Sequence, residues 1–366
     1  MADELRVGII GMGIGKPNAR AIAANERGRV AALCDLVEER MHGFAEDLPE
    51  PVACYTDYRE MCAADDVDAV FVGTPNQLHV PMALEAVENG KHVLVTKPLS
   101  DAVEPARELV QAQEEAGVVG MMSLSMRFSG GVQYLGQASR QGEFGDLYYG
   151  RARSIRRSGI PYWNLGFIEE GGGAFRDMGV HVLDSAWWVM GAPRPVGASG
   201  VGGAMLAPQG LGYWNFSSPP EEIPEKYAAD DYAGGIIRFE NGAGLQVESF
   251  WACHQPHEGT QIELFGTEAG ARLKPLTVYR TEKNAPHDTS VDLPQYTPMT
   301  GKDVDMTPPR WPAGWDAIAD HFIECILDGA DCQAPLRHGL VVQQMLEAVL
   351  QSAEAGREVA IDAAMR

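Results

Sequence analysis

The chain has few basic residues for its size. Lysine and arginine together number 29, against 51 aspartates and glutamates, and the formal net charge is −22. A field of that sign repels phosphate backbones and anionic lipid headgroups. We therefore expect neither a nucleic acid nor a membrane surface as a partner.

Long apolar runs and paired cysteines are also missing. No apolar run reaches the ~18 residues that a membrane-spanning helix needs. The acidic start, Met1 to Glu4, lacks the basic and apolar regions of a secretory signal, so we expect a cytoplasmic protein. The six cysteines form no Cys-x-x-Cys pair, and the nine histidines show no zinc-like spacing with them. We therefore predict no metal site.

The order of elements predicts two domains in the 366 residues. Residues 1–122 alternate short apolar strands with helical patterns, which is typical of a doubly wound parallel sheet, the α/β Rossmann arrangement. Residues 123–366 contain mostly alternating strands, with one long strand expected at 271–279 and irregular structure at 281–313. For this second domain we predict an α+β fold with a large, mostly antiparallel open sheet.

A glycine-rich turn follows the first predicted strand, Leu5 to Ile10, and leads into a helix. Gly11 permits a tight turn and Gly13 lets the main chain approach a pyrophosphate, although Lys16 stands where the third glycine of the fingerprint is usual. Asp35 ends the second strand, where a carboxylate can accept hydrogen bonds from ribose hydroxyls and would repel a 2′-phosphate. NAD is therefore favoured over NADP, and Asp35 could also cap the following helix.

Two further strand ends carry polar residues. The strand at 68–72 is followed by Thr74, Pro75 and Asn76, and the strand at 93–96 by Lys97 and a proline that cannot continue the ladder. Ligands of open α/β sheets bind at the carboxyl ends of strands, so these residues would face the same crevice as the glycine turn. Lys97 could instead be a surface lysine in a strand-to-helix turn.

A second group of candidates lies in the other domain. Asp177 and His181 stand four apart on a helix predicted over 174–190, and this spacing places them on one face. Glycines 171–173 precede them, and we expect these to leave room for a ligand near the helix start. The alternative for His181 is an ordinary packed histidine.

Several blocks together resemble the Gfo/Idh/MocA (glucose–fructose oxidoreductase / inositol dehydrogenase) family. The blocks are Val7 to Gly13, Gly73 to Asn76 with His79, Gly90 to Pro98, and Gly172 to His181. The final helix, which ends with Ser352 to Gly356, also fits, so the blocks cover nearly the whole chain in the family's order. Thr96 departs from the family's usual glutamate before Lys-Pro. The resemblance implies an NAD- or NADP-binding Rossmann domain, a second domain whose open sheet forms dimers or tetramers, and oxidation of a ring hydroxyl of a sugar or cyclitol, or the reverse.

The resemblance also implies site residues. The catalytic residues would be Lys97, Asp177 and His181, and the cofactor-binding residues Gly11, Met12, Gly13, Ile14, Asp35, Thr74, Pro75, Asn76, His79, Lys97 and Arg127. The substrate-binding residues would be Lys97, Asp177 and His181, together with four residues that we name for their position before the catalytic helix, because aromatic faces and planar donors suit a sugar: Arg153, Tyr162, Trp163 and Asn164. The loop containing residues 162–164 could instead be packed for structure or for contact between subunits.

The predicted function is an NAD-dependent dehydrogenase that moves a hydride between nicotinamide and a ring carbon of a sugar, glycoside or cyclitol. His181 would take the hydroxyl proton, Lys97 would stabilise the alkoxide, and Asp177 would hold a substrate hydroxyl or orient the imidazole; Lys97 and His181 could exchange roles. Two alternatives stay open: an NAD-dependent glycoside hydrolase or glycoside 3-dehydrogenase that retains its cofactor, and a non-catalytic dinucleotide sensor. The sequence leaves open the sugar, the carbon, the direction and the oligomer size.

Overall fold

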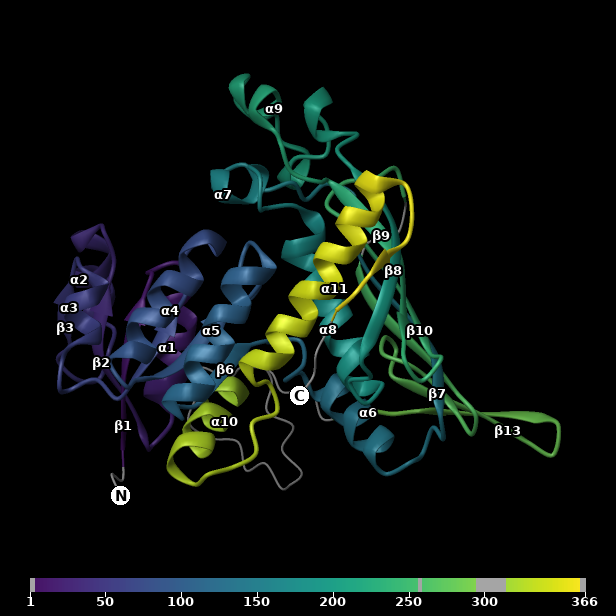
Figure 1. Cartoon of the computed structure of the whole chain (residues 1–366), viewed down its shortest axis with the longest axis horizontal. Coiled ribbons are helices and arrows are strands. Elements are labelled where there is room, and N and C mark those ends of the chain that lie inside the picture. Colours follow the sequence, from purple (N-terminus) through teal and green to yellow (C-terminus); the bar gives the residue numbers. More distant parts are fainter. Residues whose placement is uncertain (1–3, 256–258, 294–313, 363–366) are drawn as a thin grey trace. The chain divides into compact units, whose positions relative to one another are not determined.

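The computed structural model describes residues 4–255, 259–293 and 314–362 (Figure 1). The chain divides into two compact units. The first consists of Met1–Phe128 and Ala313–Gln343, and the second of Ser129–Pro312 and Gln344–Arg366. The first unit thus includes a late segment of the chain that a division into residues 1–122 and 123–366 does not assign to it.

The first unit is built on a six-stranded sheet in which every pair of neighbours is parallel. Its strand order is β3-β2-β1-β4-β5-β6. The strands are β1 (Leu5–Ile10), β2 (Gly28–Cys34), β3 (Ala53–Tyr55), β4 (Ala69–Val72), β5 (His92–Thr96) and β6 (Gly120–Ser123). All four residues of β4 are fully buried, as expected for a central strand covered by helices on both faces.

Helices follow nearly every strand of this sheet. They are α1 (Gly15–Ala24), α2 (Glu38–Ala45), α3 (Tyr58–Cys62), η1 (Asn76–Leu78), α4 (His79–Glu88) and α5 (Val103–Ala116), with α10 (Trp315–Leu327) and the first part of α11 (Leu336–Ala355) joining from the end of the chain. The strand order reverses between β1 and β4. Because crossovers are right-handed, the helices before and after that reversal cover opposite faces. The contacts agree: α1 packs on α10, while α4 packs on α3 and α5.

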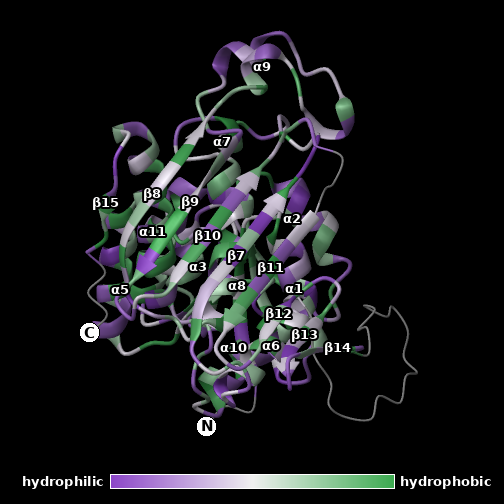
Figure 2. Ribbon diagram, turned by 90° about the vertical axis from the view of Figure 1, so that its right-hand side faces the viewer, coloured by the Kyte–Doolittle hydropathy of each residue, from purple (hydrophilic) through white to green (hydrophobic). Residues whose placement is uncertain are grey.

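The second unit contains a nine-stranded sheet of order β14-β13-β12-β11-β7-β10-β9-β8-β15. Its strands are β7 (Leu147–Ile155), β8 (Pro195–Gly203), β9 (Tyr232–Phe239), β10 (Gly244–Phe250), β11 (Gly259–Gly266), β12 (Gly270–Arg272), β13 (Thr277–Glu282), β14 (Ala285–Ser290) and β15 (Val359–Ala360). Only β7 and β10 pair in parallel. Figure 2 shows β8, β9, β10, β7 and β11 side by side. The predicted fold class is confirmed in both units.

Helices cover one face of this second sheet. The π-helical turn η2 (Phe175–Gly179) and α8 (Val180–Val189) between them pack on β7, β9, β10 and β11, and α6 (Gly130–Arg140) packs on α8. The other short helices of the unit are α7 (Leu165–Ile168) and α9 (Glu222–Lys226), with the 3-10 turns η3 (Ala207–Gln209) and η4 (Trp214–Phe216). Gly150 of β7 leaves room for Met190 at the end of α8, and Gly136 of α6 leaves room for the ring of Trp188. Residues of β7 alternate accordingly: Ala152 and Ser154 are buried, and Arg153 between them is exposed.

Two expectations about strands were wrong. The predicted strand 271–279 is divided into β12 and β13, because Pro275 has no N–H to donate to a ladder. Residues 285–290, predicted to be irregular, form β14, which pairs with β13. Lys283 and Asn284 between them have φ of 51° and 64°, as a two-residue hairpin turn requires. Residues 294–313 of that predicted irregular segment lie outside the described residues.

None of the helices in the described residues has both the length and the apolar character needed to cross a membrane.

Candidate cofactor and substrate site

The predicted cofactor residues converge at the carboxyl edge of the first sheet. Ile10 of β1 stands beside Val72 of β4, and Val72 stands beside Val95 of β5. The chain therefore leaves the three strands at one level, and Gly11, Gly73 and Thr96 lie at the same edge. This edge includes the point between β1 and β4 where the strand order reverses, which is where ligands of open α/β sheets bind.

The glycines after β1 have three different roles. Gly11 has φ of 90°, and a Cβ there would overlap with the carbonyl oxygen of Gly73. A Cβ on Gly13 would meet nothing within 4 Å, so the main chain there is open to a ligand. Gly15 begins α1 against Ile9, 2.8 Å from where its Cβ would be. Gly15 thus provides the close approach of helix and strand that the fingerprint's third glycine provides, one position before Lys16.

Asp35 holds the glycine-rich turn in place. Its Oδ2 accepts a hydrogen bond from the Met12 N–H at 2.8 Å, and its Oδ1 accepts one from the Val37 N–H at 3.0 Å. Nη1 of Arg40 lies 3.9 Å from Oδ1. The carboxylate therefore serves both the turn and the start of α2, and its remaining lone pairs are available to further donors.

His79 joins the loops that follow β4 and β5. Its Nε2 lies 2.7 Å from the carbonyl oxygen of Thr74, and its Nδ1 lies 2.8 Å from that of Pro98. Burial lowers the pKa of the imidazole, while the two carbonyl groups act in the opposite direction. The side chain has no exposed surface. It therefore cannot touch a ligand in this conformation, and its place is to hold Thr74 and the Lys97-Pro98 segment together.

Arg127 is likewise fully buried, within the first unit. Its Nη1 donates to the carbonyl oxygen of Gln333 at 2.6 Å and lies 3.0 Å from Nδ1 of His338. Burial, and then the charge of Arg127, lowers the pKa of His338 to about 3, so the imidazole is neutral and its Nδ1 accepts. These contacts tie Arg127 to the segment before α11 and to the first turn of that helix.

In the second unit, Asp177 lies in the π-helical turn η2, and His181 lies in the first turn of α8. Single π turns within helices are rare and occur often at functional sites. Both side chains are half-buried. The indole Nε1 of Trp251 donates a hydrogen bond to Oδ2 of Asp177 at 3.0 Å. The catalytic pair predicted from sequence thus includes a carboxylate whose direction is set by a tryptophan from the end of β10.

Two more side chains fix the start of this helix. Oδ2 of Asp230 accepts from the Phe175 N–H at 2.9 Å, and Oγ of Ser249 donates to the carbonyl oxygen of Ala174 at 2.8 Å. Burial raises the pKa of Asp230 to about 6, although the hydrogen bond from the Phe175 N–H opposes this. Sequence reasoning missed Asp230, Ser249 and Trp251. They lie more than fifty positions from their partners, and no local pattern marks them.

The glycines before this helix do not leave open space for a ligand, contrary to the expectation. A Cβ on Gly172 would overlap with the main chain at Phe167, and one on Gly173 would overlap with the carboxylate of Asp230. Gly173 also has φ of 107°, which favours glycine. The room that these glycines create is therefore filled by the protein's own atoms.

The loop before α7 contributes aromatic surface. Trp163 is 60% exposed, and its ring meets Trp214 edge-on with centroids 5.5 Å apart. Tyr162 is half-buried and packs against the cluster that contains Trp251. Oδ1 of Asn164 accepts from the Gly166 N–H at 3.1 Å, so this side chain caps α7. Trp163 is thus the exposed aromatic side chain of the predicted trio.

The register of β7 separates Arg153 from the helix that contains Asp177 and His181. In the sheet register Ser154 of β7 stands beside Ser249 of β10, whose hydroxyl contacts the helix start, while Arg153 stands beside Glu248. Neighbouring residues of a strand point to opposite faces. Arg153 therefore lies on the sheet face away from η2 and α8, and the structure does not bring it together with Asp177.

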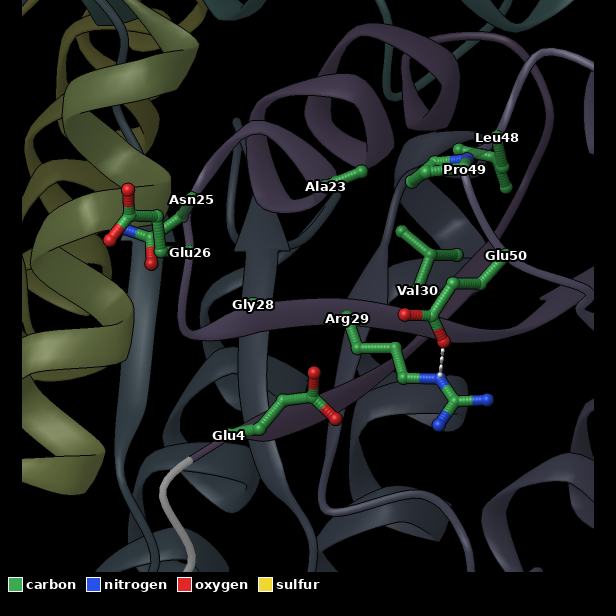
Figure 3. Close-up of a pocket in the computed structure, with 10 residues that line it drawn as sticks. All are labelled: Glu4, Ala23, Asn25, Glu26, Gly28, Arg29, Val30, Leu48, Pro49 and Glu50. Atoms are coloured by element: carbon green, nitrogen blue, oxygen red, sulfur yellow. Dashed lines mark ion pairs between the residues drawn. The ribbon is translucent and has the colours of Figure 1, made fainter.

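A shallow pocket of the first unit lies elsewhere. It is lined by Glu4, by residues of β2 including Arg29, and by the segment of Leu48, Pro49 and Glu50 (Figure 3). Nε of Arg29 pairs with Oε2 of Glu50 at 2.9 Å. Glu4 comes directly before β1, and Gly28 is the first residue of β2. The pocket therefore lies at the amino edge of the sheet, opposite the glycine-rich turn, and is separate from the candidate cofactor site.

Comparison with protein families agrees with this architecture. Residues 5–124 match the model of the oxidoreductase family with an NAD-binding Rossmann fold, and residues 139–361 match the C-terminal α/β domain of the same family. The chain belongs to the Gfo/Idh/MocA family of oxidoreductases. The family and enzyme class predicted from sequence are thereby confirmed.

Relatives of this Gfo/Idh/MocA oxidoreductase include named dehydrogenases. D-glucoside 3-dehydrogenase of Escherichia coli (strain K12) is 29% identical over 98% of both chains. scyllo-inositol 2-dehydrogenase (NAD(+)) of Bacillus subtilis (strain 168) is 25% identical over 90% of this chain and 88% of its own. Among solved structures, levoglucosan dehydrogenase in complex with NADH and levoglucosan has a TM-score of 0.81 at 22% identity, covering 98% of this chain and 100% of its own, which supports the fold.

Proposed function

We propose that this oxidoreductase transfers a hydride between NAD and a ring carbon of a sugar, glycoside or cyclitol. The observation that carries the proposal is the edge at which Gly11, Gly13, Asp35 and Lys97 leave neighbouring strands of one parallel sheet. The open main chain at Gly13 suits a pyrophosphate, and Asp35 suits ribose hydroxyls. Its negative charge favours NAD over NADP.

In this proposal NAD supplies a hydride acceptor, and residues of the chain manage the substrate and its proton. Gly11, Met12, Gly13, Ile14 and Asp35 hold the adenosine and pyrophosphate part of the cofactor. Thr74, Pro75, Asn76 and Lys97 surround its nicotinamide part, while His79 and Arg127 act as positioning residues.

The proton of the reacting hydroxyl goes to the imidazole of His181, and the ammonium of Lys97 donates a hydrogen bond to the oxygen as negative charge develops. Asp177, oriented by Trp251, accepts a hydrogen bond from a neighbouring substrate hydroxyl. The ring face of Trp163, with Tyr162 beside it, suits the C–H face of a sugar. Arg153 is not part of this substrate site. The reaction proceeds in the cytoplasm, in a homodimer or homotetramer.

The test is turnover of a panel of monosaccharides, inositols and glycosides, followed by absorbance of the reduced cofactor. Lys97→Ala and His181→Ala should each lower kcat by about 100-fold or more while NAD binding persists. Arg153→Ala and the exposed His42→Ala are matched controls and should keep normal turnover. Normal turnover in both site variants would remove the mechanism. Binding of NAD with no turnover of any polyol would instead support a dinucleotide sensor.

A cofactor-retaining enzyme is the second candidate. It is favoured by the full-length similarity to a D-glucoside 3-dehydrogenase and by glycosyl hydrolase family 109 proteins of Shewanella, which match 48% of this chain at 30% identity. Such an enzyme oxidises and re-reduces one ring carbon, so it binds NAD through repeated turnovers. To distinguish the two, the folded protein is dialysed extensively and then denatured, and the NAD that it releases is measured. About one equivalent of NAD per chain indicates retention, and its absence indicates exchange with each turnover.

A further inference from the structure

Three side chains with soft or borderline ligand atoms meet in the first unit, away from the candidate cofactor residues. His321 and Cys325 lie on α10, and Cys332 lies in the turn between α10 and α11. One ligand atom from each lies within 4.8 Å of the other two. His321 and Cys325 are buried, Cys332 is half-buried, and the two cysteines form no disulfide. The site is empty.

The spacing of two of these atoms already fits coordination. Sγ of Cys325 lies 3.4 Å from Nε2 of His321. Bonds of about 2.3 Å to sulfur and about 2.0 Å to nitrogen at a tetrahedral angle hold those atoms about 3.5 Å apart. The residues are four apart on one helix, so the helix fixes this distance.

The tautomer of His321 also fits a ligand. The Gln333 N–H donates to Nε2 at 2.9 Å, so Nε2 carries the lone pair and Nδ1 carries the proton. Nδ1 faces Oε2 of Glu324 at 3.8 Å. A carboxylate behind the protonated nitrogen is the usual support of a histidine that binds a metal. A cation would take the place of the Gln333 N–H at Nε2.

We propose that His321, Cys325 and Cys332 bind one thiophilic cation with a filled d shell, of which Zn²⁺ is the divalent example and Cu⁺ the monovalent one. Two thiolates and one imidazole are the ligands such ions select, and solvent would complete the coordination of Zn²⁺. Each thiol releases its proton to solvent as the metal–sulfur bond forms. This proposal differs from the sequence-based prediction of no metal site. The spacing in sequence did not indicate the site, because Cys332 comes close to His321 and Cys325 only through the turn after α10.

A bound cation would fasten an edge of the parallel sheet. The turn that contains Cys332 continues to Ala334, whose carbonyl oxygen accepts from the Met122 N–H at 2.8 Å, and to Pro335, which bridges to Met121 of the edge strand β6. The cation would join this covering segment to α10. We expect a structural effect, measurable without any substrate.

The experiment uses the full chain, stripped with a chelator under reducing conditions and equilibrated separately with Zn²⁺, Co²⁺ and Cu⁺. About one equivalent of Zn²⁺ or Cu⁺ should remain after gel filtration, and Co²⁺ should show a thiolate-to-metal charge-transfer band. Cys325→Ser and Cys332→Ser should lose both signals. Cys54→Ser, which removes another thiol of the same unit, is the matched control and should keep them.

Thiol titration of the unaltered chain covers the case in which a variant does not fold. Zn²⁺ should shield two of the six thiols from an alkylating reagent, and mass spectrometry should locate them at Cys325 and Cys332. Little retained metal in the unaltered chain, equal retention in both serine variants, or a Cys325–Cys332 disulfide in freshly purified protein would each overturn the proposal. None of these readouts depends on NAD or on turnover.

Discussion

The two units hold their candidate site residues in different ways. At the edge of the first sheet the glycine-rich turn is fixed mainly by the main chain, with Gly11 against the carbonyl of Gly73 and one carboxylate on the Met12 N–H. In the second unit the helix start is fixed by side chains from other strands: Asp230, Ser249 and Trp251. Where main-chain atoms pack directly against each other, as at Gly11, almost no side chain can be added. Where side chains hold a segment through hydrogen bonds, each substitution removes one interaction.

The largest effect is expected from Gly11→Ala. A left-handed φ alone costs a residue with a Cβ about 1–2 kcal/mol, and overlap with Gly73 adds to this. We expect a lower free energy of unfolding in urea and an NAD affinity reduced by about 100-fold or more. Gly13→Ala should weaken NAD binding alone, because its Cβ enters open space. Gly43→Ala, whose Cβ also meets nothing within 4 Å, lies inside α2, so it should leave NAD binding unchanged and raise the free energy of unfolding by about 0.5–1 kcal/mol. Unchanged stability of Gly11→Ala would contradict the main-chain fit.

A smaller effect is expected from Trp251→Phe. The phenyl ring keeps an aromatic side chain in the core, although it fills less of the volume, and it removes the donor to Asp177, a hydrogen bond to a charged group worth about 1.5–3 kcal/mol. If the bond acts in the transition state, kcat should fall about 10- to 100-fold with an unchanged Kd for NAD. Trp187→Phe is the control, because it removes an indole donor to the carbonyl of Pro193. An equal loss of kcat in both variants would indicate a purely structural role.

The free energy of unfolding should depend on pH through His338 in the first unit. Its pKa is lowered to about 3 from an unfolded value near ~6.5, so its contribution is complete above pH ~6.5 and is lost as pH falls toward 3. Between pH 7 and 5 the unaltered chain should lose up to roughly 2 kcal/mol relative to His338→Gln, in which an amide oxygen can still accept from Arg127. Parallel pH profiles of the two proteins would contradict this.

The smallest effect, of opposite sign, is expected from Asp230 in the second unit. Its pKa is raised to about 6, so the unfolded chain loses the proton first and stability falls as pH rises from ~3.8 through 6. Asp230→Asn removes this titration, and relative to it the unaltered chain should gain about 1 kcal/mol between pH 7 and 5. If instead the variant becomes more stable relative to the unaltered chain as pH falls, the folded protein stabilises the charged form of the Asp230 carboxylate, which would contradict this prediction.

Sequence patterns predicted most of the elements because most of them depend on local features. The parallel strands are continuous apolar runs, and the strands of the second sheet alternate, so each could be recognised separately. The elements that were missed lack such features: β14 contains Pro286 and has no buried residue, and β15 has only two residues. The division at Pro275 was available in the sequence, since proline cannot donate to a ladder.

The candidate site was predictable where its residues directly follow the ends of strands. Gly11, Asp35 and Lys97 follow strands directly, so the position of the strand determines their position. The sequence named His79 and Arg127 as cofactor-binding residues, but it did not show that both side chains are fully buried. Arg153 was named from its proximity in sequence to the catalytic helix, and the alternation of β7 turns it to the other face.

By itself the sequence determined the fold class, the reversal of strand order that gathers the glycine turn and the lysine at one edge, and the family. Only the tertiary structure decided which groups orient Asp177, which predicted residues are buried supports, and that His321, Cys325 and Cys332 meet. The physical reason is range: periodicity and turn chemistry act over a few neighbouring residues, whereas a hydrogen bond or a cluster of ligands depends on where distant segments of the folded chain are packed.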